Sequence, residues 1–191
     1  VKRSPSQSVN KKPEIPLGRL CSGKGQLELV EAFSLLHKKS PSTHLLLVGG
    51  LHENEGADVN FVSILKNKIN ELALTDFVTF SGFRKDTDRM LAAMDIICLP
   101  NHNEAFGLTA IEAMAAKRPI VGSNTGAFPE ILDSTALLVD PLNIEELAHL
   151  ILSYIEDSDL MSAKAQAAYS RALKEFSMEA HISKLLEVYN P

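Results

Sequence analysis

Cysteine, tryptophan and net positive charge are scarce or missing in this sequence. Its 191 residues include two cysteines, no tryptophan, and 24 acidic against 19 basic side chains, for a net charge of −5. This acidic balance argues against a general nucleic-acid-binding protein, which normally presents a basic surface. Cys21 and Cys98 lie in or beside apolar runs, which predicts buried, reduced thiols in a cytosolic protein. No apolar run reaches the length of a membrane span, and no signal peptide is recognisable.

The nucleotide-binding motifs of two large enzyme classes are also incomplete or missing. No G-x-G-x-x-G fingerprint occurs, which counts against an NAD enzyme. The segment Gly18–Gly25, GRLCSGKG, is one residue short of a Walker A motif, because Gly25 stands where Ser or Thr would hold magnesium. The apolar run ALLVD, ending at Asp140, could serve as a Walker B strand, so an ATPase is a minor alternative.

We expect no metal site. The six histidines are scattered without metal-ligand spacing. Two D-x-D triplets, Asp86–Asp88 and Asp157–Asp159, each precede a helical pattern. We therefore predict that these carboxylates cap helices rather than bind a metal ion.

The chain divides into a polar start and one apolar-rich region. Residues 1–13 are rich in Ser, Pro, Lys and Asn, which predicts a linker or a disordered arm. Residues 14–191 are predicted to form one domain, since the chain is 45% hydrophobic and long enough to bury a core. Because the sequence begins without Met, we expect it to be part of a longer protein.

Short apolar runs alternate with helical patterns throughout residues 14–191. The apolar runs predict about six strands, at 14–20, 43–48, 77–83, 96–100, 119–123 and 136–140. Helical spacing is found at 26–39, 59–72, 86–94, 144–155, 158–173 and 178–189 and in the segments that follow residues 107 and 127. This order predicts an α/β fold, a Rossmann-like doubly wound parallel sheet with helices on both faces. Ligands bind such sheets at the carboxyl ends of the strands, so the loops there carry the function.

The loop after the first predicted strand combines two cations with glycines. The planar guanidinium of Arg19 can hold a phosphate through two hydrogen bonds, and Lys24 adds a point charge. Gly23 and Gly25 let the backbone approach a ligand closely. We predict a phosphate role, with a glycine-rich turn and two solvated cations as the alternative.

The segment 95–132 is predicted as strand, loop, helix, strand, loop and helix. Free amides and the helix dipole at the first helix would form an anion site, built from Ala105, Phe106, Gly107 and Leu108. Glu104 precedes this turn and could accept hydrogen bonds from sugar hydroxyls, or it could be an N-cap or first-turn acid. Glu112 lies inside the helix, where spacing alone leaves both a ligand contact and a solvated position open.

Two further loops end predicted strands. The segment 81–85 could support a base along its backbone at Phe83 and Arg84, and a solvated turn is an equal alternative. Gly49 and Gly50 are predicted to form a tight strand exit. His102, in the loop before Glu104, is predicted to be a solvated loop residue.

Several of these motifs together resemble one family. EAFGLTAIE at 104–112, AMAAKRPIVGS at 113–123 and GAFPEIL at 126–132 resemble the E-x7-E signature of retaining glycosyltransferases of the GT-B fold, the glycosyl transferases group 1, family 4. The upstream pattern G-R-L-x-x-x-K-G matches the phosphate loop of that family, and S-G-F at 81–83 matches its base-binding loop. The resemblance extends from about Ile15 to Tyr189.

The resemblance implies a role for each matched residue. Arg19 and Lys24 would neutralise the diphosphate of a nucleotide sugar, and the amides of residues 106–108 would hold its phosphates and the sugar edge. Glu104 would contact the transferred sugar, and Glu112 would bond the ribose hydroxyls. On this basis Glu104, Arg19 and Lys24 are the expected catalytic residues.

The remaining matched positions would contact the donor, and three departures from the family pattern accompany them. Gly18 opens the phosphate loop, and the backbone near Phe83 and Arg84 would contact the base. The departures are Ala105 where Gly is common, Lys117–Arg118 before Pro119, and Ala127 in place of a second Gly. None of them removes a charged group, although the first and last could alter the shape of the sugar pocket and of a phosphate-side turn.

The resemblance also implies an activity and a setting. The family transfers a hexose from a UDP- or GDP-sugar to an acceptor hydroxyl with retention and without an obligatory metal or other cofactor. Its members have two Rossmann-like domains, so this chain would be the second, donor-binding domain and would be inactive without the N-terminal acceptor domain. Surface polysaccharide or glycolipid synthesis is the expected setting, in the cytoplasm and at the inner face of the membrane through peripheral association. A sugar-nucleotide epimerase of the same fold and a non-catalytic nucleotide-binding module are the alternatives.

Overall fold

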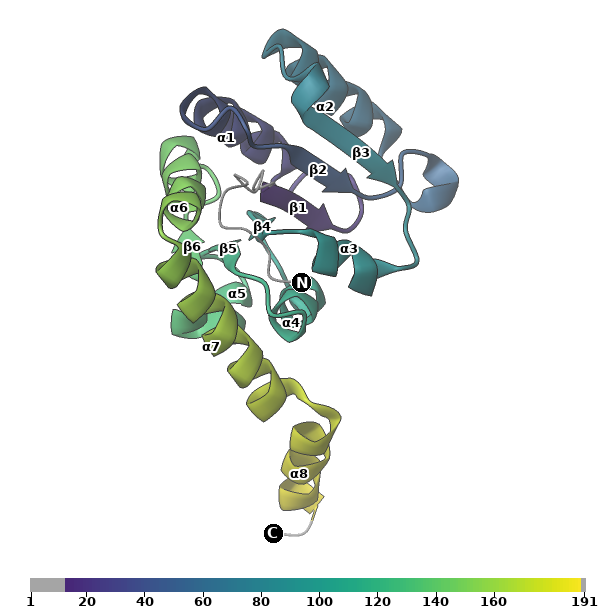
Figure 1. Ribbon diagram of the computed structural model, residues 1–191. Helices are drawn as coiled ribbons and strands as arrows, with labels where there is room; N and C mark the ends of the chain where they lie inside the picture. Colours follow the sequence, from purple (N-terminus) through teal and green to yellow (C-terminus); the bar gives the residue numbers. More distant parts are fainter. Residues whose placement is uncertain (1–12, 190–191) are drawn as a thin grey trace, which may run out of the picture.

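A computed structural model describes residues 13–189, and they form one parallel sheet with helices on both faces (Figure 1). The six strands lie in the order β3-β2-β1-β4-β5-β6, and every neighbouring pair is parallel. They are β1 (Pro13–Leu17), β2 (Leu45–Val48), β3 (Val78–Gly82), β4 (Ile96–Leu99), β5 (Ile120–Ser123) and β6 (Leu137–Val139). The predicted Rossmann-like doubly wound sheet is therefore confirmed.

Within residues 13–189, eight α-helices and three short 3₁₀ helices connect and follow these strands. The α-helices are α1 (Gln26–Lys39), α2 (Val59–Glu71), α3 (Thr87–Ala93), α4 (Leu108–Ala115), α5 (Phe128–Leu132), α6 (Ile144–Glu156), α7 (Ser158–Phe176) and α8 (Met178–Tyr189). The 3₁₀ helices are η1 (Glu53–Glu55), η2 (Thr75–Phe77) and η3 (Asp133–Thr135), and the sequence patterns predicted none of them. None of the described helices is long and apolar enough to cross a membrane.

Strand β4 shows why the apolar runs predict a sheet that is covered on both faces. Ile96 and Cys98 belong to a core formed with α1, α2 and α6, whereas Ile97 and Leu99 belong to a core with α3, α4, α5 and α7. All four side chains are buried, since alternate residues of a strand point to opposite faces. A continuous apolar run is the composition that such a strand requires.

Most predicted boundaries agree with the structure to within a few residues. The strand expected at 14–20 is β1, which begins at Pro13 and ends at Leu17, and α7 continues to Phe176 beyond the expected residue 173. The predicted linker at 1–13 falls outside the described residues except for Pro13, so it stays a prediction.

The two D-x-D triplets behave differently. Asp157 caps α7, because its Oδ1 accepts hydrogen bonds from the amides of Asp159 and Leu160 at 3.0 and 2.8 Å. Asp86 occupies the predicted N-cap position of α3, but the capping bond is missing, because its carboxylate accepts from Arg84 Nε at 2.9 Å and Nη2 at 2.7 Å. A guanidinium two residues away offers two charged donors, which this carboxylate takes in preference to a helix amide.

The two cysteines also differ. Cys98 is fully buried, and burial raises the pKa of its thiol. Cys21 is half-buried in the loop after β1, so the prediction of burial was wrong for this residue. Both thiols are free.

Helix α8 extends away from the sheet, as Figure 1 shows at the yellow end of the chain. None of its described residues is buried, and the side chains of Met178, Leu186 and Tyr189 are among the exposed large apolar groups. The pair between Lys184 Nζ and Glu175 Oε2 at 3.0 Å joins the middle of this helix to the end of α7.

Candidate functional site

The site lies where the strand order reverses, between β1 and β4, at the carboxyl ends of the strands. Two cavities of about 390 and 280 Å³ open there. The larger is lined by Gly18, Arg19, Val48, Gly49, Gly50, Glu55, Gly56, Phe83, Arg84, Thr87, Thr109 and Glu112. The smaller is lined by Gly18, Arg19, Lys24, Gln26, Leu99, Asn101, Glu104, Phe106, Leu108 and Thr109. Because Gly18, Arg19 and Thr109 line both, the two cavities form one continuous site.

The loop between β1 and α1 is held tightly against the end of β4. Gly25 precedes α1 in the left-handed region with φ 73°, and a Cβ at this position would lie 1.9 Å from the carbonyl oxygen of Pro100. Any side chain there would clash with backbone, including the Ser or Thr of a Walker A motif. Asp140, the acid of the Walker B alternative, follows the far edge strand β6 and accepts a hydrogen bond from the Leu142 amide at 2.9 Å. These two observations count against the ATPase alternative.

The carboxylate of Glu104, which lines the smaller cavity, accepts four hydrogen bonds. Its Oε2 accepts from Lys24 Nζ at 2.9 Å and from Asn101 Nδ2 at 2.6 Å. Its Oε1 accepts from the amides of Gly107 at 3.2 Å and Phe106 at 3.4 Å. Glu104 therefore occupies amides that the sequence predicted for a phosphate, and it is neither an N-cap nor a first-turn acid, because Gly107 is the cap of α4.

These contacts decide the charge of Glu104. Burial by itself would raise the pKa of the carboxyl, but hydrogen bonds from Lys24, the Gly107 amide and Asn101 outweigh it and lower the pKa to about 2. Glu104 is consequently an anion throughout the physiological pH range, and Lys24 is its counter-ion.

The backbone of Glu104 is fixed by the loop after β5. The Ala127 amide donates to the Glu104 carbonyl at 2.8 Å, and a Cβ on Gly126 would lie 2.4 Å from that same oxygen. Thr125 Oγ1 donates to the Asn101 carbonyl at 3.1 Å. The position of the carboxylate therefore depends on a loop more than twenty residues further along the chain.

His102 joins the loop before α4 to the loop before α1. Its amide donates to the Gly23 carbonyl at 2.9 Å, and its Nε2 lies 2.8 Å from Glu28 Oε1. His102 is thus a loop residue whose side chain is still 37% exposed, and it has a carboxylate partner that the sequence did not indicate. Together, these two contacts place the loop that carries Lys24 beside the loop that carries Glu104.

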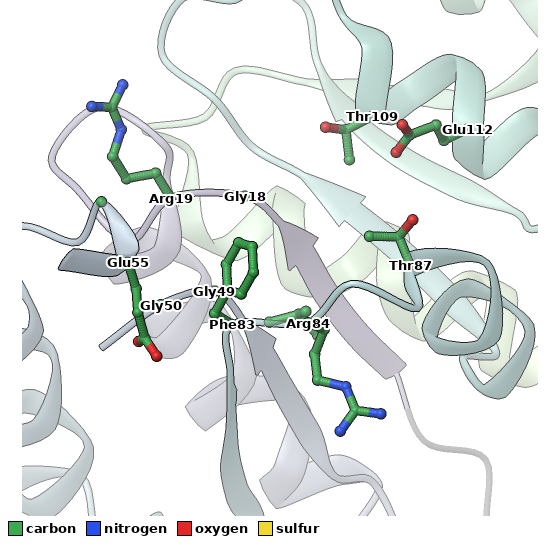
Figure 2. A pocket seen from close by; sticks show the side chains of 12 residues that line it. Gly18, Arg19, Gly49, Gly50, Glu55, Phe83, Arg84, Thr87, Thr109 and Glu112 are labelled. Carbon is green, nitrogen blue, oxygen red and sulfur yellow. The ribbon is translucent and has the colours of Figure 1, made fainter. Parts of the chain in front are cut away.

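The larger cavity is bounded by α4 on one side and by the loops after β2 and β3 on the other. Figure 2 shows Thr109 and Glu112 together on α4, across the cavity from Phe83 and Glu55. Glu112 thus lines the cavity while remaining exposed, so its contact with a ligand stays a prediction. The Phe83 ring is 56% exposed, so it offers an apolar surface for a ring of a ligand.

Two glycines at the end of β2 also line the larger cavity. A Cβ on Gly49 would lie 2.2 Å from the Gly18 carbonyl oxygen, and one on Gly50 would lie 2.4 Å from Glu55 Cβ. The tight strand exit predicted for this pair is present, and the pair belongs to the site as well.

Among the described residues, no group of three or more His, Cys, Asp and Glu is arranged to hold a metal ion.

The sequence of this chain matches a known family over most of its length. The family model for glycosyl transferases group 1 covers residues 2–171. The chain belongs to this family.

The group 1 relatives include both transferases and solved domains. The mannosylfructose-phosphate synthase of Agrobacterium fabrum is 31% identical over 176 residues, which are 90% of this chain and 39% of that protein. The structure of HepE from Anabaena in complex with UDP and glucose is 27% identical with a TM-score of 0.84, over 95% of this chain and 48% of that one. The C-terminal domain of the group 1 protein LpcC from Francisella tularensis is 30% identical with a TM-score of 0.77, over 88% of this chain and 87% of that domain. The chain thus spans less than half the length of the synthase and of HepE, and it matches most of the separate LpcC domain.

The group 1 motifs account for most of the site. The smaller cavity is lined by the motif residues Gly18, Arg19, Lys24, Glu104, Phe106 and Leu108. The larger cavity is lined by Phe83, Arg84 and Glu112. Ala105 is exposed and lines neither cavity. Gly107 lines neither cavity but donates its amide to Glu104.

Sequence patterns missed several residues of the site. Thr109 stands three positions before Glu112, a helical spacing that could have placed both on one face of α4. Gln26 is buried, and its side-chain amide donates to the Arg19 carbonyl at 3.1 Å. No local signal in the sequence pointed to Asn101 or Thr87 as neighbours of the site.

Proposed function

We propose that this chain is the donor-binding domain of a retaining glycosyltransferase that moves a hexose from a nucleoside diphosphate sugar to an acceptor hydroxyl. One observation carries the proposal. Arg19, Lys24 and the start of α4 converge with Glu104 on a cavity that continues into a second cavity beside Phe83 and Glu112. A cationic, amide-rich centre with a carboxylate and an apolar ring at its two sides suits a diphosphate that joins a sugar to a nucleoside.

Each part of the donor has a place in this arrangement. The diphosphate would lie across the region that both cavities share, within reach of Arg19, Lys24 and the amides of residues 106–108 at the start of α4. The nucleoside would fill the larger cavity, with its ribose hydroxyls on Glu112 and its base beside Phe83. The hexose would lie in the smaller cavity, where Glu104 accepts hydrogen bonds from its hydroxyls.

The chemistry of the site follows from its charges. In the transfer, the anomeric carbon exchanges its bond to a diphosphate oxygen for a bond to the acceptor oxygen. Negative charge grows on the departing diphosphate, which takes up the proton of the acceptor hydroxyl. Fixed cations and amides that already point at this position stabilise the transition state more than the ground state. Arg19 and Lys24 would therefore act on the leaving group, and Glu104 would orient the sugar.

The acceptor and the setting rest on the family. Because the chain spans 39% of the length of the synthase and 48% of HepE, we propose that an N-terminal domain of the same protein binds the acceptor. We propose a UDP- or GDP-sugar as the donor, retention of configuration and a role in polysaccharide or glycolipid synthesis, all from the resemblance to retaining group 1 enzymes.

A charge-neutralising double variant tests the proposal. Arg19→Ala with Lys24→Ala is expected to weaken UDP or GDP binding by about 100-fold or more, because each removes a charge-assisted hydrogen bond worth about 1.5–3 kcal/mol. Isothermal titration calorimetry would measure the affinities of the 191-residue chain. The matched control is Lys38→Ala with Lys39→Ala, which removes the same charge from the exposed end of α1. Undiminished nucleotide affinity in the Arg19 and Lys24 double variant would refute the role of the loop.

A further inference from the structure

We infer that Glu104 makes the site selective for nucleotides that carry a sugar, because its carboxylate competes with the diphosphate for the same hydrogen-bond donors. This inference rests on the proposed function. A bare nucleoside diphosphate must displace the carboxylate and leave it without replacement donors. A nucleotide sugar also displaces it, but the sugar brings hydroxyl groups that can donate to it.

The competition follows from the contacts of the two carboxylate oxygens. Lys24 donates to Oε2, and the amides of Gly107 and Phe106 donate to Oε1. The proposed function assigns the same ammonium group and the same helix start to the diphosphate. The short Lys24 contact of 2.9 Å leaves no room for a phosphate oxygen between the two groups.

Glu104 cannot move far from this position. Its carbonyl accepts from the Ala127 amide, and Gly126 packs so closely on its backbone that a Cβ there would clash with both its nitrogen and its oxygen. The loop therefore stays in place, and only the side chain of Glu104 can rotate. The Glu104 side chain, which is 17% exposed, would remain beside a diphosphate bound to Lys24.

Asn101 can still donate one hydrogen bond to the carboxylate when Lys24 binds a diphosphate instead. Its Nδ2 lies 2.6 Å from Glu104 Oε2, the residue is 6% exposed, and Thr125 holds its carbonyl. One amide donor does not replace an ammonium group and two backbone amides. The remaining lone pairs of Glu104 need new donors, and sugar hydroxyls are donors of this kind.

Charge repulsion adds to the difference between the two ligands. A bare nucleoside diphosphate has a terminal phosphate with a second ionisation near neutral pH, whereas that phosphate is esterified in a nucleotide sugar. The bare nucleotide therefore places more negative charge next to an unpaired carboxylate. Arg19 makes no ion pair with another described residue, so it is available to both ligands alike.

The test measures the affinities of the wild-type chain and of Glu104→Gln for three probes, UDP, UDP-glucose and inorganic pyrophosphate. GDP and GDP-mannose serve as a second pair of bare and sugar-bearing nucleotides. In Glu104→Gln we expect UDP and pyrophosphate to bind about three- to tenfold more tightly, because the competing anion is gone. UDP-glucose should bind equally or more weakly, so that the preference for the sugar-bearing ligand falls. Glu179→Gln on exposed α8 removes the same charge far from the site and should change none of these affinities.

Two outcomes separate this inference from the proposed function. If wild-type chain binds a nucleotide and Glu104→Gln binds the bare diphosphate no more tightly, the inference is overturned and the proposed function stands. If neither form binds any probe, both are overturned.

A measurement on the wild-type chain does not depend on the folding of a variant. Carbon-13 NMR of the Glu104 carboxyl should report a higher pKa when the chain is saturated with pyrophosphate, because Lys24 then bonds the ligand. An unchanged pKa at saturation would overturn the inference.

Discussion

At the scale of single residues, Glu104 shows how context determines a role. The sequence allowed a capping acid or a sugar ligand, and four hydrogen bonds in the structure make it the anion of the smaller cavity. Its nearest cation, Lys24, lies 80 positions earlier in the chain. No local pattern connects the two residues, since only the adjacency of β1 and β4 brings their loops together.

This ion pair predicts a dependence of stability on pH. The pKa of Glu104 is about 2 in the folded chain, against 4.5 for a free side chain. The carboxylate therefore stabilises the fold above pH 4.5, and this contribution disappears as the pH falls from 4.5 to 2. Between pH 7 and pH 3, the unfolding free energy of the wild-type chain should fall by about 1 kcal/mol more than that of Lys24→Met. The difference is small because the pair is partly exposed. Urea denaturation at the two pH values measures the difference. Lys38→Met serves as the exposed control, and an equal pH dependence in wild-type and Lys24→Met would contradict the prediction.

At the scale of elements, the junction of the β1–α1 loop with the end of β4 determines the shape of the site. Gly25 begins α1 against the Pro100 carbonyl, and the Gly23 carbonyl accepts from the His102 amide. The sequence identified both glycines as places where the backbone could approach a ligand. The structure shows that the close approach at Gly25 is to another strand.

The two glycines provide a matched pair of variants. Both have positive φ, 73° at Gly25 and 84° at Gly23, but a Cβ on Gly23 meets nothing within 4 Å. Gly23→Ala should cost about 1 kcal/mol of unfolding free energy from the left-handed backbone alone. Gly25→Ala adds the clash with Pro100 and should cost about 3 kcal/mol or more. Denaturant unfolding compares the two, and equal losses would show that the loop yields at Gly25 without strain.

Helix ends show where local rules succeed. Asp157 caps α7 as its pattern predicts, since its side chain accepts from the amides of Asp159 and Leu160. Asp86 fails as a cap because Arg84 lies within reach. The capping rule describes a preference, and a charged neighbour changes the outcome.

At the scale of the whole molecule, a chain with a net charge of −5 gathers Arg19 and Lys24 at the one edge where its strand order reverses. This placement needs no basic surface overall, because local cations and helix amides determine the potential in a cavity. Such a site can hold a small anionic ligand on an acidic protein.

We predict that the 191-residue chain binds a nucleotide but transfers no sugar. The proposed site would supply only donor contacts, and the chain covers less than half of the related synthase and of HepE. The chain incubated with UDP-glucose or GDP-mannose and candidate acceptors should release no nucleoside diphosphate above the uncatalysed rate. A coupled assay for UDP or GDP release measures this, with calorimetry on the same sample as the control for binding. Measured transfer by the chain alone would contradict the prediction.

The sequence by itself determined the fold class, the alternation of strands and helices, and the family, because the periodicity of apolar residues and the order of motifs are local properties of a chain. The run IICLP predicted a strand covered on both faces, and β4 is such a strand. Only the tertiary structure decided that Lys24 pairs with Glu104, that Glu112 faces the site, and that Gly25 abuts Pro100. These contacts join loops that are adjacent only because β1 lies beside β4 in the sheet, and strand order is not encoded in the spacing within any single segment.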